Sequence, residues 1–151
     1  MHWLKGAALA LALCVGGAMT ALAYSPAEEA AFAQMGLSKN GEEWLDEVCG
    51  QPNQLQIETI DLGGEIGEVM QVIAGGPCYG QAGALTALFK VEGAEPRMLF
   101  SDLCYGVTPL ETTSNGVKEF YVGVPGFEFP VMAWNGAEFV RARTMKDPSL
   151  P

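Results

Sequence analysis

Apolar and polar residues alternate with a period of two along most of the chain from Gln54 onward. Successive side chains of a strand point to opposite faces of a sheet, so this pattern predicts strands. Gly, Pro, Asn and Asp separate the segments at short intervals, which is typical of an antiparallel meander. We expect about seven short strands, at residues 54–59, 69–74, 84–91, 97–103, 117–124, 129–134 and 138–143.

The pattern before residue 50 differs and predicts helices. Ser25 can cap a helix, Pro26 suits its first turn, and Glu28 can close a capping box with Ser25. Apolar residues then recur every four positions until Gly36 ends this helix. A second short helix is expected over residues 41–49, with apolar residues on one face and acidic residues on the other.

These elements predict an α+β fold, in which an N-terminal helical segment precedes an antiparallel β meander. We divide the chain after residue 23 into a helical segment at 24–50, a β-rich domain at 51–143 and a C-terminal tail at 144–151. A weak internal repeat aligns residues 67–72 with residues 118–123. The repeat suggests that the β-rich domain contains two similar β units packed together.

The first 23 residues have the layout of a signal peptide. A polar start precedes an apolar run, and residues 21–23 read Ala-Leu-Ala, which fits an A-x-A cleavage site. We expect cleavage after residue 23 and a periplasmic or secreted location. Lipid attachment at Cys14 is the weaker alternative, because Leu13 before it is not small. No apolar run is long enough to make a good membrane span.

Removal of this leader would leave a strongly acidic chain. It would carry 18 acidic and 7 basic residues, a net charge of −11. This charge argues against nucleic acid and anionic lipid as partners and favours a basic protein. The only histidine, His2, would leave with the leader. Its loss excludes a Ser-His-Asp triad, a Cys-His dyad and the ordinary histidine-containing zinc sites.

Three cysteines, Cys49, Cys78 and Cys104, would remain after cleavage. Three cysteines allow one disulfide in three possible pairings. The tripeptide Cys-Tyr-Gly begins at both Cys78 and Cys104, so we expect these two to pair. Cys49 would then be inert or would pair with another molecule.

Five short segments together match one pattern: residues 31–36, Trp44 with Cys49, residues 61–68, residues 78–80 and residues 126–136. They resemble the motifs of a family of small exported bacterial proteins of uncharacterised function. The family carries a D-L-N-G-D-G-x-x-E segment that is similar to the calcium loops of FG-GAP and VCBS repeats. Its later motifs read C-Y-G and G-F-C-F-P-V-x-x-W-N-G. The resemblance covers most of the chain and implies no established activity.

The resemblance implies a calcium loop that begins at Asp61. Asp61 keeps the first ligand position, Glu65 is a longer third ligand, and Glu68 can close the site. The loop departs from the pattern because Gly63 replaces the second oxygen ligand and Ile66 replaces the glycine of the sharp turn. The alternative interpretation is a tight β-turn that has kept the shape of the loop and lost the ion.

We expect a non-enzymatic binding module that recognises a basic protein, for example as an inhibitor or immunity factor for a secreted one. The first alternative is a structural calcium-binding module. The second is a hydrolase that uses two carboxylates and needs no histidine. Its candidate residues are Asp61, Glu65, Glu68, Asp102 and Glu128. No cofactor other than calcium is expected.

Overall fold

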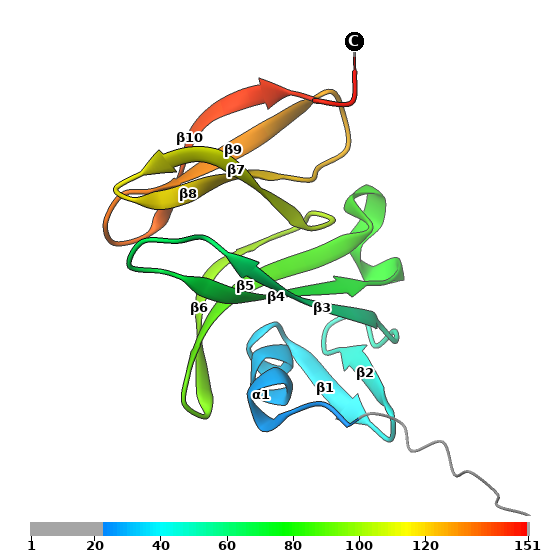
Figure 1. The fold of residues 1–151 in the computed structure, drawn as a ribbon. Helices are drawn as coiled ribbons and strands as arrows, with labels where there is room; N and C mark the ends of the chain where they lie inside the picture. Colours follow the sequence, from blue (N-terminus) through cyan, green and yellow to red (C-terminus); the bar gives the residue numbers. More distant parts are fainter. Residues whose placement is uncertain (1–22, 151) are drawn as a thin grey trace, which may run out of the picture.

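The structure, a computed structural model, describes residues 23–150. The predicted signal peptide lies outside the described residues, apart from its last residue, Ala23. The described chain forms three layers, and Figure 1 shows a small N-terminal layer, a middle sheet and an upper sheet. No helix in this range is long and apolar enough to cross a membrane.

The N-terminal layer consists of α1 (Pro26–Gln34), β1 (Leu37–Asn40) and β2 (Glu43–Asp46). The predicted capping box of α1 is confirmed. The Ser25 hydroxyl accepts a hydrogen bond from the Glu28 amide, and the Glu28 carboxylate accepts one from the Ser25 amide. The helix buries Phe32, whose ring meets the ring of Trp44 on β2 edge to face, with 4.9 Å between centroids. This aromatic contact holds the helix against the hairpin.

The second predicted helix, over residues 41–49, is wrong. The segment instead forms the turn of the hairpin, β2 and a following turn. Gly41 has a φ of 64°, a value that favours glycine and lets the chain reverse after β1. Asp46 then ends β2, because its carboxylate accepts hydrogen bonds from the amides two and three residues later. The spacing of apolar and acidic residues here fits a strand followed by a turn as well as it fits a helix.

The middle sheet contains β3 (Gln54–Asp61), β4 (Glu68–Gly75), β5 (Ala84–Glu92) and β6 (Glu95–Asp102), with a short 3₁₀ helix, η1 (Pro77–Ala82), between β4 and β5. All neighbouring strands are antiparallel and follow chain order. β4 and β5 lie at the centre of the sheet and are largely buried on both faces. This burial explains why their sequences are nearly continuous apolar runs.

The upper sheet contains β7 (Val107–Ser114), β8 (Val117–Val122), β9 (Glu128–Trp134) and β10 (Phe139–Lys146). It is also an antiparallel meander in chain order. The turn between β9 and β10 contains Asn135, whose side-chain oxygen accepts hydrogen bonds from two following amides. Residues 67–72 and 118–123, which form the internal repeat, fall on or beside the second strand of each four-stranded sheet.

The α+β fold class is therefore wrong. The described residues are 55% strand and 12% helix, and they contain ten strands in three antiparallel sheets rather than about seven strands. The strands without a sequence prediction are β1, β2 and β7. β7 carries no apolar alternation, because Pro109 interrupts it and its second half is polar. Its pairing with β8 is also irregular between Pro109 and Thr113.

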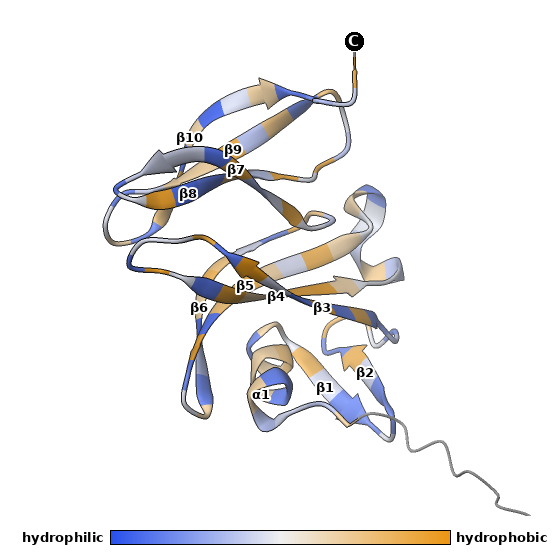
Figure 2. Cartoon of the chain, in the orientation of Figure 1, coloured by the Kyte–Doolittle hydropathy of each residue, from blue (hydrophilic) through white to orange (hydrophobic). Residues whose placement is uncertain are grey.

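Two apolar cores separate the three layers, and Figure 2 shows the apolar residues that the strands carry. The alternation along β5 divides neighbouring residues between them. Leu88 belongs to the core between the two four-stranded sheets, together with Phe120 and Trp134. Phe89 belongs to the core between the middle sheet and the N-terminal layer, together with Phe32. The middle sheet is thus packed on both faces.

Candidate functional site

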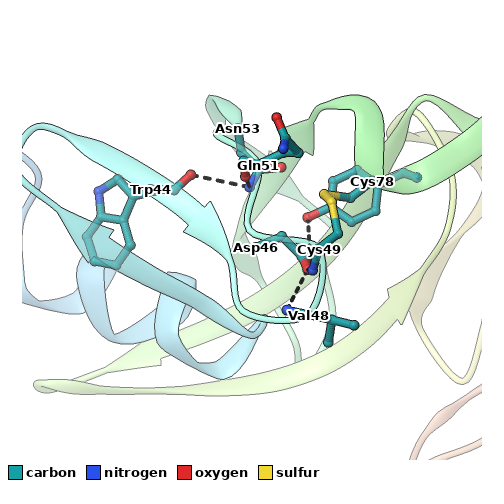
Figure 3. The surroundings of a disulfide bond; sticks show 8 residues. Trp44, Asp46, Val48, Cys49, Gln51, Asn53 and Cys78 are labelled. Atoms are coloured by element: carbon teal, nitrogen blue, oxygen red, sulfur yellow. Dashed lines mark hydrogen bonds between the residues drawn. A yellow bond between two sulfur atoms is a disulfide. The ribbon is translucent and has the colours of Figure 1, made fainter.

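A disulfide joins Cys49 to Cys78, with 5.9 Å between their Cα atoms, so the predicted pairing of Cys78 with Cys104 is wrong (Figure 3). Cys49 follows β2 and Cys78 lies in η1, so the bond ties the N-terminal layer to the middle sheet. Cys104 is a free thiol, fully buried between the two sheets. Burial raises the pKa of the Cys104 thiol to about 11, which makes it a poor nucleophile at neutral pH.

Asp46 organises the surroundings of this disulfide. Its Oδ1 atom accepts hydrogen bonds from the amides of Val48, at 2.9 Å, and Cys49, at 2.8 Å (Figure 3). Its Oδ2 atom accepts one from the Tyr79 hydroxyl, at 3.2 Å. The pKa of Asp46 is lowered, chiefly by the hydrogen bond from the Cys49 amide. The pKa of Tyr79 is raised to about 12, chiefly by burial and then by the nearby charge of Asp46.

Asp46, Cys49 and Cys78 form the one group of three potential metal ligands whose donor atoms gather within 4.8 Å in the described part of the chain. Both sulfur atoms of this group are already joined in the disulfide. A metal ion would need them as free thiolates. The two cysteines therefore link two layers covalently and cannot serve as metal ligands while they are joined.

The residues predicted to bind calcium do not gather in this way among residues 23–150. The Asp61 carboxylate accepts a hydrogen bond from the Gly63 amide at 2.9 Å. The Glu65 carboxylate accepts one from the indole N–H of Trp134, on β9 of the upper sheet. Glu68 faces Asp61 across the β3–β4 pair. Calcium binding stays a prediction, and the contact with Trp134 gives Glu65 a structural role of its own.

The loop between β3 and β4, residues 62–67, is a clasp between the two four-stranded sheets. The Leu62 carbonyl oxygen accepts a hydrogen bond from the Lys118 amide at 2.7 Å. A Cβ atom on Gly64 would lie 2.5 Å from the Gly116 carbonyl oxygen, so this approach requires glycine. The Lys90 ammonium donates a hydrogen bond to the Ile66 carbonyl oxygen and supplies a positive charge inside the clasp.

A shallow groove of about 510 Å³ lies between the middle and upper sheets and is the candidate binding site. It carries aromatic rings, amide groups and carboxylates. Tyr121 and Phe129 stack at 5.3 Å between ring centroids, with 12° between their planes. Glu58 and Asp147 are the only charged residues among the described residues that line it. The lining residues are Gln56, Glu58, Gln71, Ile73, Tyr105, Gly106, Val107, Thr108, Tyr121, Gly123, Phe129, Asp147, Pro148 and Ser149.

Two buried polar side chains hold the chain at the base of this groove. The Gln71 side-chain oxygen accepts a hydrogen bond from the Val107 amide at 2.7 Å, and its nitrogen donates to Glu58 at 3.1 Å. The Thr86 hydroxyl donates to the Cys104 carbonyl at 2.8 Å and accepts from the Gly106 amide at 2.9 Å. These bonds satisfy the backbone of the turn between β6 and β7, which would otherwise be unpaired.

The turn presents Tyr105 at the mouth of the groove. Tyr105 is 57% exposed, and its hydroxyl accepts a hydrogen bond from Gln56 at 3.4 Å. A Cβ atom on Gly123 would lie 3.0 Å from the Tyr105 carbonyl oxygen, so glycine allows the upper sheet to approach this turn closely. The pattern of the sequence did not predict the groove residues. The available signal was a polar residue, Gln71, inside the apolar run of β4.

The five carboxylates considered for a hydrolase are spread over several elements. Asp61 ends β3, Glu65 lies in the clasp and Glu68 begins β4. Asp102 ends β6, where its carboxylate accepts a hydrogen bond from the following amide at 2.8 Å, and Glu128 begins β9. None of the five lines the groove between the sheets.

Comparisons with protein-family models, with curated proteins and with solved structures find no match to this chain. The similarity to the family of small exported bacterial proteins therefore stays a prediction.

Proposed function

We propose that the protein is an exported, non-enzymatic binding module that docks a basic protein partner at the groove between its two four-stranded sheets. One observation carries the proposal: every charged residue that lines the groove is acidic, on a chain whose exported form would have a net charge of −11. A negative potential of this kind steers basic partners and raises their association rate.

The groove offers two kinds of contact to a lysine or arginine side chain. The carboxylates of Glu58 and Asp147 can accept charge-assisted hydrogen bonds. The rings of Tyr105, Tyr121 and Phe129 offer aromatic faces, and a cation over such a face gains about 0.5–2 kcal/mol. Together these contacts suit a basic segment better than an acidic or purely apolar one.

Two further observations support the location and the non-enzymatic role. Disulfides form in oxidising compartments, so the Cys49–Cys78 bond agrees with a periplasmic or secreted protein. The described residues contain no histidine, which is the commonest acid–base group of enzymes at neutral pH. A domain that captures a basic protein would suit an inhibitor or immunity factor of a basic secreted protein.

The test is affinity capture with the immobilised protein, from an extract of the exported fraction of the source cell, washed at low and high salt. We expect a basic protein that salt releases. The Glu58→Gln variant keeps the acceptor for Gln71 and removes the charge, so it should bind the captured protein more weakly. Glu92→Gln, at the exposed end of β5 and away from the groove, is the matched control. Equal binding by both variants would contradict docking at the groove.

A further inference from the structure

β3 is the edge strand of the middle sheet, and it lacks the proline, basic residue or register shift found at the other edges of the two four-stranded sheets. At the opposite edge, β6 contains Pro96, whose carbonyl accepts a hydrogen bond from Gln34 of α1 at 2.8 Å. β7 contains Pro109 and a register shift. β10 carries basic side chains and a register shift after Arg141. Prolines, bulges and charged lysines or arginines are the usual devices that keep an edge strand from pairing.

β3 has eight residues in continuous register with β4, and it contains no proline and no basic residue. Such an edge presents a row of unpaired backbone donors and acceptors. Its side chains are apolar and polar in alternation, which is the pattern of a regular strand. β3 is therefore the edge on which a further strand can add.

The register identifies the backbone groups that face outward. Facing residues of an antiparallel pair alternate between those that exchange both hydrogen bonds and those that exchange none. The Leu62 amide bonds to the Gly67 carbonyl at 2.9 Å, one step beyond the Asp61–Glu68 pair. The alternation then leaves Asp61, Thr59 and every second residue before them without bonds to β4. Their N–H and C=O groups point to the open edge.

Hollows adjoin β3 along its length, and all their charged residues are acidic. The groove between the sheets borders Gln56 and Glu58. A second hollow borders Ile57 and Thr59, with Glu28 and Glu68 in its wall. A third lies where β3 begins, and its charged residues are Glu42 and Glu43. An added strand would thus lie in a negative field on both of its faces.

We propose that the basic partner binds β3 by strand addition: an extended segment of the partner that carries lysines or arginines pairs with the open edge of β3. The backbone hydrogen bonds supply the affinity, and the acidic hollows on either side select basic side chains at alternate positions. This inference rests on the proposed function and names its docking mode. A second copy of the chain is a poor occupant, because each copy would bring its own acidic residues, Glu58 and Asp61, to the shared edge.

The test uses a synthetic peptide of alternating lysine and valine, with blocked ends and eight residues to match β3. A second peptide has the same charge and carries N-methyl groups on all of its backbone nitrogens, so that neither of its edges can donate hydrogen bonds to β3. We expect the full chain to bind the first peptide in a salt-dependent manner and the methylated peptide about tenfold or more weakly, because methylation removes the donors needed for pairing.

The protein side of the test is Thr59→Pro, with Thr59→Val as its matched control. The Thr59 N–H faces the open edge, so proline there removes an outward donor and leaves the bonds to β4 in place. Valine changes the side chain and keeps the donor. We expect Thr59→Pro to weaken peptide binding about tenfold and Thr59→Val to leave it near the wild-type value. If the proline destabilises the fold, the methylated peptide still tests the inference on the wild-type chain.

Equal binding of both peptides, or equal binding by the two Thr59 variants, would overturn strand addition while basic-partner binding stands. A dimer of the chain that Thr59→Pro dissociates in sedimentation would overturn the assigned occupant. Failure of the wild-type chain to bind either peptide would overturn the inference. The proposed function has its own test in the salt-sensitive capture, which reports on groove charge through Glu58 and does not depend on backbone pairing.

Discussion

The Lys90 side chain reaches from β5 into the loop between β3 and β4, where its ammonium group donates a hydrogen bond to the carbonyl oxygen of Ile66. A Cβ atom on Gly67 would lie only 3.5 Å from the Lys90 Nζ atom. The loop predicted to bind calcium thus already contains a positive charge that belongs to the chain. A fixed ammonium satisfies a carbonyl oxygen that would otherwise turn to water or to a cation.

We predict that the clasp is stable without calcium. The thermal unfolding midpoint of the wild-type chain should be the same in excess calcium and in a chelator, because the three predicted ligands do not gather among the described residues. A midpoint that rises with calcium would contradict this prediction and support the calcium-binding module.

The companion prediction concerns Lys90 itself. Lys90→Met keeps the apolar stem and removes the ammonium, so the Ile66 carbonyl loses its donor. We expect the free energy of unfolding to fall by about 1 kcal/mol, as measured by denaturant titration. Lys118→Met is the control, because Lys118 contacts the clasp through its backbone amide. An equal fall in the free energy of unfolding in both variants would contradict this prediction, because it would show that any lost positive charge has the same effect as loss of the Lys90–Ile66 hydrogen bond.

The disulfide should stabilise the chain by limiting its unfolded state. The bond closes a loop between cysteines 29 residues apart, which corresponds to about 3–4 kcal/mol in the chain-entropy account. We expect Cys49→Ser with Cys78→Ser to lower the free energy of unfolding by this order. Peptide mapping without reductant gives the direct check. A peptide that links Cys78 to Cys104 would contradict the structure.

Cys104 should make stability depend on alkaline pH. Burial raises the pKa of its thiol from 9.0 to about 11, so the unfolded chain loses this proton at lower pH than the folded chain. The stabilising contribution is full below pH 9 and is lost as the pH rises toward 11. The free energies of unfolding of wild type and Cys104→Ala, measured by denaturant titration, should therefore approach each other as the pH rises across this range. Rapid alkylation of the native thiol at pH 8 would contradict its burial.

Local signals in the sequence predicted local structure well. The capping box of α1 depends on Ser25 and Glu28, three residues apart, and could be read directly. The strands at the centre of the middle sheet carry dense apolar runs and were also predictable. The segment at 41–49 failed because its spacing fits two structures, and the packing of Trp44 against Phe32 decides between them. That contact is a tertiary one, and the local spacing of apolar and polar residues does not reveal it.

The disulfide pairing and the groove could not be predicted from the sequence pattern for a related reason. Spacing alone leaves three cysteine pairings open, and the fold selects one by bringing the loop after β2 beside η1. Gln71 and Val107 meet across 36 positions of sequence. A buried glutamine inside an apolar strand signals that some partner exists, but only the stacking of the two sheets identifies the Val107 amide.

The last prediction tests whether Gln71 holds the groove in shape. Gln71→Met keeps the volume of the side chain and leaves the buried Val107 amide without its acceptor, which costs about 1–3 kcal/mol. Hydrogen exchange of the Val107 amide should accelerate in this variant. Binding at the groove should weaken, because Glu58 loses the hydrogen bond from Gln71 that holds its carboxylate in place. Glu58→Gln leaves the Gln71–Val107 bond intact, so it should weaken binding and leave the Val107 exchange rate unchanged. Unchanged exchange in Gln71→Met would show that the turn between β6 and β7 is held by Thr86 alone.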